Sequence, residues 1–190
     1  IRVSSPSSHD LYTLGQQTIV SDTACYPAKL MHGHVEDLKN KEVDYIFAPS
    51  LTYNINENKG DNHYNCPVVA YYPEVIRCNV KMNEGTKLLS PFLDISNEKT
   101  FPKYFTRQML SDGIELRERD VKKAADLAYK ALYDYKREVE NEGKHIIEVS
   151  ERENIPLVVL VGRPYHVDSE INHGIDTLLT SLGASIITED

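Results

Sequence analysis

The sequence predicts an α/β fold with a Rossmann-like, mostly parallel sheet, flanking helices and one inserted long-helix segment. Three observations support this prediction. Short apolar runs rich in β-branched residues alternate with amphipathic segments of helical length. The apolar runs are continuous rather than alternating, which is typical of strands that are covered on both faces, as in parallel sheets. Strands that alternate with helices form βαβ units, and such units build α/β proteins.

Five segments are predicted as strands. The clearest is 157–161, Leu-Val-Val-Leu-Val, which is bounded by Pro156 and Gly162. Proline ends two of the others, because it cannot donate a backbone hydrogen bond to a neighbouring strand. The remaining predicted strands are 43–48, ended by Pro49; 67–72, ended by Pro73; 184–188; and a truncated edge at 1–3.

Four segments are predicted as helices. The strongest prediction is 120–139, where apolar residues recur at the i, i+3, i+4, i+7 spacing and charged residues fill the opposite face. We expect this helix to continue through Gly143 to Glu153. The other predicted helices are 9–17, with Ser8 as its N-cap; 28–41; and 169–182, which is entered by Asp168-Ser169 and closed by Gly183.

The expected organisation is a single α/β domain over 1–190, or a fragment of a longer chain. The sequence lacks an initial Met and stops directly after an apolar run, so we expect a piece of a longer protein. The alternation of strands and helices breaks after residue 81, and 81–153 is therefore predicted as a helical insertion. Residues 54–65 form a long polar segment between two predicted strands, and loops of that length are usually functional or mobile.

Composition excludes several classes of function. The chain has 190 residues, with 21 Lys+Arg against 29 Asp+Glu and a formal net charge of -8. No basic cluster is present, which argues against nucleic acid or an anionic membrane as the main partner. No apolar run approaches the ~20 residues of a membrane span, and no secretory signal is visible, so a cytoplasmic location is expected. The three Cys are expected to be free thiols, catalytic groups or metal ligands rather than a disulfide framework.

Cys25 is the first candidate for chemistry. Pro27 suits the first turn of the following helix, which places Cys25 at or just before the helix N-terminus. A thiol in that position is favoured as the thiolate by the helix dipole, so Cys25 is a candidate metal ligand or nucleophile. An inert buried cysteine is the alternative. His32 and His34 are two residues apart on a helix and cannot share one ligand face, so a buried or capping pair is expected.

Cys66 is the second candidate. It lies at the end of the polar loop and is followed by Pro67, and Cys-Pro is a common arrangement among iron–sulfur ligands. No CxxC pair is present, so spacing alone indicates neither a zinc site nor a ferredoxin-like site. The third cysteine, Cys78, is expected inside a short helix as a small buried hydrophobe.

The segment from Gly162 to Ser169 is the third candidate site. It connects the clearest strand to a helix, and a glycine and an arginine at such a turn form a ready anion site. The spacing matches neither GxGxxG nor the Walker lysine motif, and an ordinary βα turn is the alternative. Asn172 and His173 lie one turn into the following helix and are expected to face the same crevice. The predicted ligand-binding residues are Arg163, Tyr165, His166, Asn172, His173 and, in the first candidate region, Lys29.

Five ordered motifs carry a family resemblance that spans roughly 21–190. The sequence resembles the domain of unknown function in large bacterial CoA-substrate-specific enzyme activases, which are similar to the activator of 2-hydroxyglutaryl-CoA dehydratase. The motifs are Cys25-Tyr26-Pro27-Ala28-Lys29 with His32-Gly33-His34; Tyr64-Asn65-Cys66-Pro67; Tyr72-Pro73-Glu74-Val75-Ile76; Gly162-Arg163-Pro164-Tyr165-His166; and Glu170-Ile171-Asn172-His173-Gly174.

The resemblance implies a role in ATP-driven, low-potential electron transfer to an acyl-CoA, in a system of the 2-hydroxyacyl-CoA dehydratase (lyase) type. In such systems an ATPase module, in the same chain or a partner chain, works with a protein that holds a [4Fe–4S] cluster. This sequence has no phosphate-binding glycine loop of the ATPase kind and would therefore correspond to the cluster-bearing or accessory side. Cys25 and Cys66 lie in the motifs and are the implied ligands. Further ligands would come from beyond Asp190 or from a second subunit. The resemblance therefore does not require that this fragment binds the cluster by itself.

Two other hypotheses remain open at this point. The first is a metal-free binding or scaffold module that uses the Arg163 loop for a CoA- or nucleotide-like anionic ligand. A homo-oligomer is compatible with this hypothesis. The second is a transferase with Cys25 as nucleophile and a nearby histidine. Whether the chain is itself an enzyme is left open by the sequence.

Overall fold

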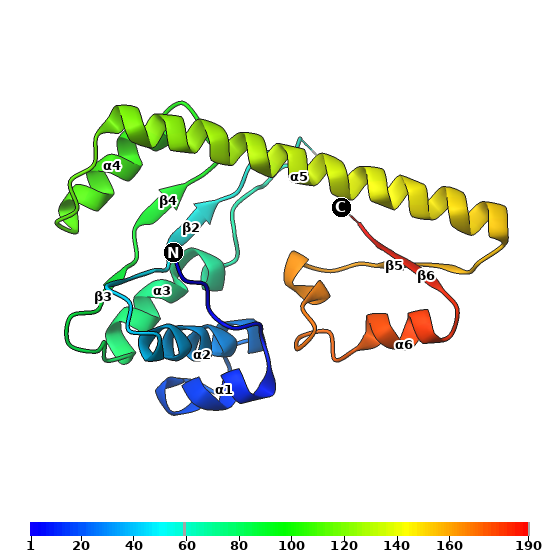
Figure 1. Ribbon diagram of the computed structural model, residues 1–190, viewed down its shortest axis with the longest axis horizontal. Helices are drawn as coiled ribbons and strands as arrows, with labels where there is room; N and C mark the ends of the chain where they lie inside the picture. The colour runs from blue at the N-terminus through cyan, green and yellow to red at the C-terminus, as the bar shows by residue number, and fades with distance from the viewer. Residues whose placement is uncertain (59, 190) are drawn as a thin grey trace. The chain divides into compact units, whose positions relative to one another are not determined.

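The computed structural model describes residues 1–58 and 60–189; Lys59, inside the predicted polar loop, and Asp190 lie outside the described residues. The chain divides into two units, Ile1–Ala128 and Tyr129–Asp190 (Figure 1). The first unit contains α1 (His9–Gly15), the 3₁₀ helix η1 (Gln16–Thr18), α2 (Tyr26–Asn40), β1 (Tyr45–Phe47), β2 (Ser50–Tyr53), α3 (Pro67–Asn79), β3 (Lys87–Leu89), β4 (Phe92–Asp94), α4 (Phe101–Ser111) and the start of α5 (Glu118–Glu153). The second contains the rest of α5, then β5 (Leu157–Leu160), η2 (Pro164–Val167), α6 (Ile175–Ser181) and β6 (Ser185–Thr188).

The strands of the first unit form two consecutive parallel pairs, β1 with β3 and β2 with β4. The two pairs share one register across the short gap between them, since Phe47 pairs with Leu89 and Ser50 with Phe92. Pro49 therefore stands opposite Pro91. Neither proline has an N–H to donate, so the hydrogen-bond ladder is interrupted at the same place in both strands. Pro49 ends the predicted strand as expected, but the sequence did not reveal that a strand resumes directly after it.

Residues 67–72, predicted as a strand, form the first half of α3 instead. A continuous apolar run does not distinguish a buried strand from a buried helix. Pro67 suits the first turn of a helix, and Val68, Tyr72 and Ile76 follow one another at helical i, i+4 spacing. Tyr72 and Ile76 belong to the buried core, and Val68 packs against it. The helix also continues through Pro73, so proline does not end this element.

The core of the first unit lies between α2, β1 and α3. Ile76 and Ile46 are among its least exposed side chains. The buried cluster consists of Ala28, Val35, Ile46, Tyr72, Ile76 and Val80. Helix α1 begins as predicted at Ser8, whose hydroxyl accepts a hydrogen bond from the Leu11 N–H at 3.1 Å.

Two predictions for this part of the chain are corrected by the structure. Residues 1–3 form no strand. The segment 81–153, predicted as a helical insertion, contains β3 and β4 as well as α4 and α5, and these strands complete the parallel pairs of the first unit. Each of the two strands has only three residues, which is too short a run to stand out in the sequence. The long helix itself is confirmed, including its continuation through Gly143 to Glu153.

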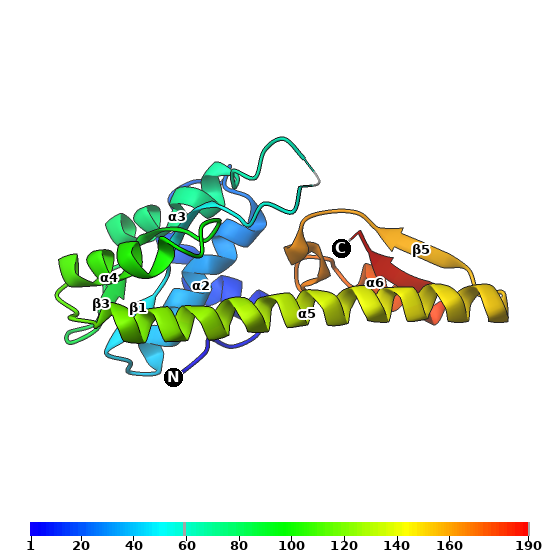
Figure 2. The same ribbon diagram turned by 90° about the horizontal axis from the view of Figure 1, so that it is seen from above.

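The second unit is built around one parallel strand pair. β5 and β6 lie side by side (Figure 2), with Val158 paired to Ile186 and Leu160 to Thr188. Both strands and their α6 crossover were predicted. Helix α6 begins later than the predicted residue 169, because His173 and Gly174 have φ values of +56° and +75°, a left-handed conformation that an α-helix does not include. In the turns before it, Asp168 Oδ1 accepts the N–H groups of Glu170 and Ile171. The helix ends before Gly183, whose φ of +85° closes it as expected.

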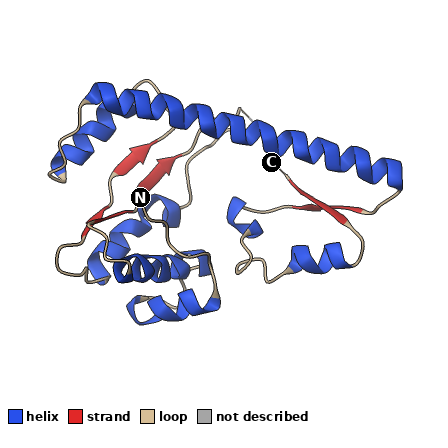
Figure 3. Ribbon diagram, viewed as in Figure 1, coloured by secondary structure: helices blue, strands red, loops and turns tan. Residues whose placement is uncertain are grey.

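The mixture of helices and parallel strands agrees with the predicted α/β class (Figure 3). The single Rossmann-like sheet is not confirmed, since within the described residues the strands pair only in twos. No helix among these residues combines the length and the apolar character that crossing a membrane requires.

Candidate functional site

Cys25 and Cys66 occupy equivalent positions at the starts of two helices. Cys25 is the N-cap of α2, with φ -64° and ψ 155°, and Cys66 is the N-cap of α3, with φ -60° and ψ 153°. Each helix has a proline in its first turn, and neither thiol caps its helix through a side-chain hydrogen bond. Cys25 was predicted at a helix N-terminus. Cys66 was expected at the start of a strand and instead shares the same arrangement.

The three cysteines are free thiols that differ in their place on the fold. Cys25 is exposed and Cys66 is partly exposed. Cys78 lies in a short helix as predicted, but it is exposed rather than buried. It sits near the C-terminal end of α3, and at 1.5 Å per residue roughly 18 Å of helix separates it from Cys66. Cys78 therefore cannot share one small metal site with Cys66.

The N-terminus of α3 lies beside the carboxyl end of β2. The Asn65 N–H donates to Thr52 O at 2.9 Å, and the Asn65 side-chain amide donates to Leu51 O at 3.0 Å. These bonds hold Cys66 next to the end of the strand. Ligands in α/β proteins typically bind outside the carboxyl ends of parallel strands, so Cys66 lies where such proteins place their sites.

The first turns of α2 and α3 border the same core. Ala24, which precedes Cys25, and Val68, two residues after Cys66, both pack against the buried cluster that contains Tyr72. Burial raises the pKa of the Tyr72 hydroxyl, and the negative charge of Cys25 raises it further. Cys25 on α2 is therefore close enough to α3 to act electrostatically on it.

A buried histidine connects the two helices. His32 of α2 is fully buried, with Nδ1 at 2.8 Å from Thr18 Oγ1 and Nε2 at 3.0 Å from the Tyr72 hydroxyl. Thr18 Oγ1 donates its own proton to Gly15 O at 2.9 Å, so it accepts from His32 Nδ1–H. Nε2 then accepts from the Tyr72 O–H. His32 is thus a neutral imidazole with both nitrogens bonded, and burial lowers its pKa despite the nearby charge of Glu36.

The expectation that His32 and His34 serve structural roles agrees with these contacts. His34 is partly buried and bonds through Nδ1 to Ser4 Oγ at 2.9 Å and through Nε2 to Ser7 Oγ at 3.4 Å. Among the residues that the structure describes, no group of three or more His, Cys, Asp or Glu side chains could hold a metal ion. The described residues therefore do not by themselves complete a metal site around Cys25 or Cys66.

The predicted anion loop lies in the second unit, after β5. The Gly162 N–H donates to Glu189 Oε1 at 3.1 Å, and the Arg163 N–H donates to His166 Nδ1 at 2.8 Å. A Cβ on Gly162 would lie 1.9 Å from His166 Nδ1, so glycine is required for the ring to fold back over the turn. The two backbone N–H groups that would face an anion at this turn are already bonded within the chain.

The other predicted ligand-binding residues do not all gather at that turn. Tyr165 stacks edge-on against His166, with ring centroids 5.0 Å apart. Asn172 is buried and His173, with φ of +56°, is exposed. Lys29 belongs to the first unit, where its Nζ donates to Asp22 O at 2.9 Å. Lys29 and the loop residues are thus carried by different units.

Sequence reasoning missed a cavity of about 490 Å³ in the second unit. It lies between α5 and the β5–β6 pair, and Asn172 is the one predicted site residue that lines it. Gly143, a glycine in the interior of the longest helix, also lines it and is the sequence signal that could have pointed there.

Comparison with known families decides the assignment. The family model described as the CoA enzyme activase uncharacterised domain matches residues 1–190. The chain belongs to this family. The match confirms the resemblance that the five motifs indicated, and it supports an activase-like role within a system that includes a partner enzyme. No curated protein and no solved structure matches the chain. The family assignment therefore rests on the domain model together with the ordered motifs.

Proposed function

We propose that this CoA enzyme activase domain supplies two thiolate ligands, Cys25 and Cys66, to a [4Fe–4S] cluster that takes part in ATP-driven, low-potential electron transfer to an acyl-CoA system. The observation that carries the proposal is the matched pair of N-cap cysteines on α2 and α3. The two thiols have the same backbone conformation, and each precedes a helix with a proline in its first turn.

The donor set fits an iron–sulfur cluster in type and setting. Cysteine thiolates are the usual ligands of such clusters, and neither thiol has a side-chain capping bond that would compete for it. The free N–H groups of a helix N-terminus stabilise negative charge. Each of the two helix N-termini would therefore help to stabilise an anionic, thiolate-bound centre.

The residues around the thiols hold them in place. The Tyr72–His32–Thr18 hydrogen bonds connect α3, α2 and η1 without a charged group. They fix the two helices relative to each other. When bound, the cluster supplies reversible one-electron transfer. The protein controls its potential through helix dipoles, burial and hydrogen bonds to sulfur.

Cys25 and Cys66 are two ligands of the four that a [4Fe–4S] cluster takes. Cys78 is too far along α3 to be a third. We therefore propose that the remaining ligands come from another segment of the protein or from a second subunit, which makes the cluster a shared element of a larger assembly.

The proposal predicts the outcome of anaerobic reconstitution of the complete protein with iron and sulfide. After reduction, the wild type is expected to show the electron paramagnetic resonance signal of a [4Fe–4S] cluster. Cys25→Ala and Cys66→Ala are each expected to lose the signal and most of the bound iron, because each removes a ligand. Cys78→Ala is the matched control and should retain both. A wild type without a cluster, or a signal unchanged in Cys25→Ala, would refute the assignment.

A further inference from the structure

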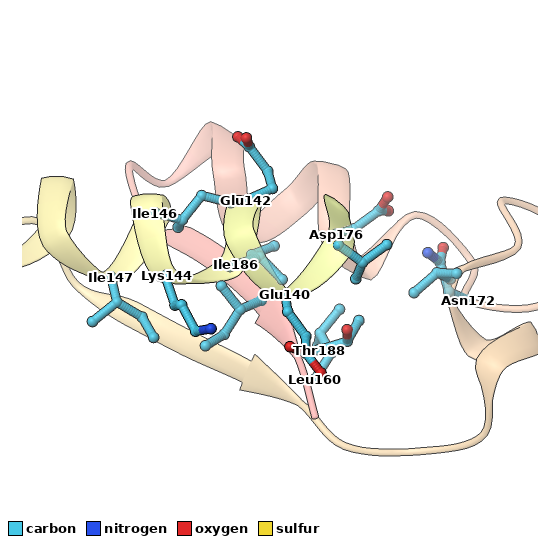
Figure 4. A pocket seen from close by; sticks show the side chains of 14 residues that line it. Glu140, Glu142, Lys144, Ile146, Ile147, Leu160, Asn172, Asp176, Ile186 and Thr188 are labelled. Carbon is cyan, nitrogen blue, oxygen red and sulfur yellow. The ribbon is translucent and has the colours of Figure 1, made fainter. Parts of the chain in front are cut away.

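The cavity of the second unit has the character of a small-molecule site. Its volume of about 490 Å³ falls within the range of pockets that enclose such ligands. Its walls are mainly aliphatic, from Ile146 and Ile147 on α5, Leu160 on β5, and Ile186 and Ile187 on β6 (Figure 4). It reaches the ends of both strands at Leu160 and Thr188. The carboxyl end of a parallel strand pair is the usual ligand position in α/β proteins.

One polar group in this cavity has an unused hydrogen-bond donor. Asn172 is only 8% exposed, and its Nδ2 is buried without a hydrogen-bond partner. The other end of the amide is fixed, since Oδ1 accepts the Gly174 N–H at 2.7 Å. That bond decides which atom is oxygen and which is nitrogen. Figure 4 shows the amide nitrogen on the side of the other lining residues. A buried donor without a hydrogen-bond partner is unfavourable, so Asn172 favours a ligand with an acceptor.

Gly143 provides an independent indication that the space is kept open. A glycine inside a helix is less favourable than an alanine. A Cβ at Gly143 would meet no atom within 4 Å, so no close contact in the protein requires a glycine there. Gly143 lines the cavity from α5. A side chain at this position would project toward the space that a ligand needs.

Charged groups at the cavity select against an anion. Glu140, Glu142 and Asp176 line it, and Lys144 is the single cation among its lining residues. A carboxylate or phosphate ligand would meet net negative charge. A protonated amine has no lone pair and would leave the Asn172 donor without an acceptor.

We propose that this cavity binds a small molecule with an aliphatic body and a neutral carbonyl acceptor, such as an amide or an ester, with the carbonyl oxygen bonded to Asn172 Nδ2. The proposal goes beyond the electron-transfer role and does not depend on it, because the cavity contains no cysteine and the binding needs no cluster.

Ligand-detected NMR titration of the full chain tests the proposal with three six-carbon probes: hexanamide, hexanoate and hexylamine. Hexanamide is expected to bind with a dissociation constant on the order of 1 mM. The charged probes should bind at least about tenfold more weakly. Asn172→Asp keeps the acceptor for the Gly174 N–H but removes the donor, and should weaken hexanamide binding about tenfold.

Two substitutions on α5 form a matched pair. Gly143→Leu fills the cavity and should abolish binding without lowering the melting temperature, because it also improves helix propensity. Asn141→Leu, two residues away and outside the lining, should leave binding unchanged. If Asn172→Asp fails to fold, Gly143→Leu decides the test. Absence of saturable hexanamide binding overturns the proposal, as does equal binding of hexanoate or unchanged binding in Gly143→Leu.

Discussion

Gly33→Ala is expected to destabilise the first unit by about 3 kcal/mol. A Cβ at position 33 would lie 2.0 Å from Leu11 O and 2.7 Å from Leu11 C. These are backbone atoms of α1, so a rotamer change cannot relieve the clash and the two helices must separate. Gly15 on α1 is equally constrained, since its Cβ would lie 2.2 Å from Gly33 N. The two glycines let α1 and α2 approach closely enough for Thr18 to reach His32.

Thermal unfolding followed by circular dichroism measures the effect of Gly33→Ala. A loss of about 3 kcal/mol corresponds to a melting temperature lower by roughly 6–12 °C for a chain of this size. Gly143→Ala is the control, because this glycine is also inside a helix but its Cβ meets open space. It should raise stability by about 0.5–1 kcal/mol. Equal effects at the two positions would contradict the close packing of α1 on α2.

Tyr72→Phe is expected to cost about 1–3 kcal/mol. The substitution keeps the ring in the core but removes the O–H that donates to His32 Nε2, and the buried nitrogen is left without a partner. Equilibrium denaturation of the variant and the wild type gives the difference in unfolding free energy. Tyr45→Phe, at an exposed tyrosine of the same unit, should change stability by less than about 0.5 kcal/mol.

The same histidine makes stability depend on pH. Burial lowers the pKa of His32 in the folded chain below its usual value of 6.5. The unfolded state therefore binds a proton more readily, and the folded state loses stability as the pH falls from 6.5 toward the lowered folded pKa. We expect a decline in unfolding free energy over this range, and His32→Gln should flatten it. A wild-type profile that is level or rises as the pH falls would show that His32 is not held neutral.

The elements that the sequence predicted correctly have a long amphipathic pattern or an apolar run with a clear boundary at each end. The continuous helical stripe of α5 and the apolar run 157–161 between Pro156 and Gly162 were both placed correctly. The prediction of a strand at 67–72 was wrong, because six consecutive apolar residues are compatible with a strand or a helix. The packing of Tyr72 and Ile76 in the core favours the helix. The three-residue strands β3 and β4 form through pairing with distant partners, which no local pattern reveals.

The sequence singled out candidate residues, but their arrangement in space depends on the fold. Cys25 and Cys66 stood out through the neighbouring prolines and motifs, yet their equivalence as N-caps depends on α3 being a helix. The cavity at Asn172 could not be predicted from the sequence, because its walls come from α5, β5, η2, α6 and β6, which only the fold brings together. The buried amide of Asn172 and the helix glycine Gly143 indicate a binding site only because both line the same cavity.

The proximity of Cys25 and Cys66 is the central claim, and cross-linking with the bifunctional thiol reagent dibromobimane tests it most directly. The reagent bridges only thiols that lie close together, and peptide mapping by mass spectrometry identifies the linked pair. The proposed shared site predicts one intramolecular Cys25–Cys66 cross-link, with Cys78 alkylated singly. Single alkylation of all three cysteines, or a cross-link that involves Cys78, would contradict a shared site at the starts of α2 and α3.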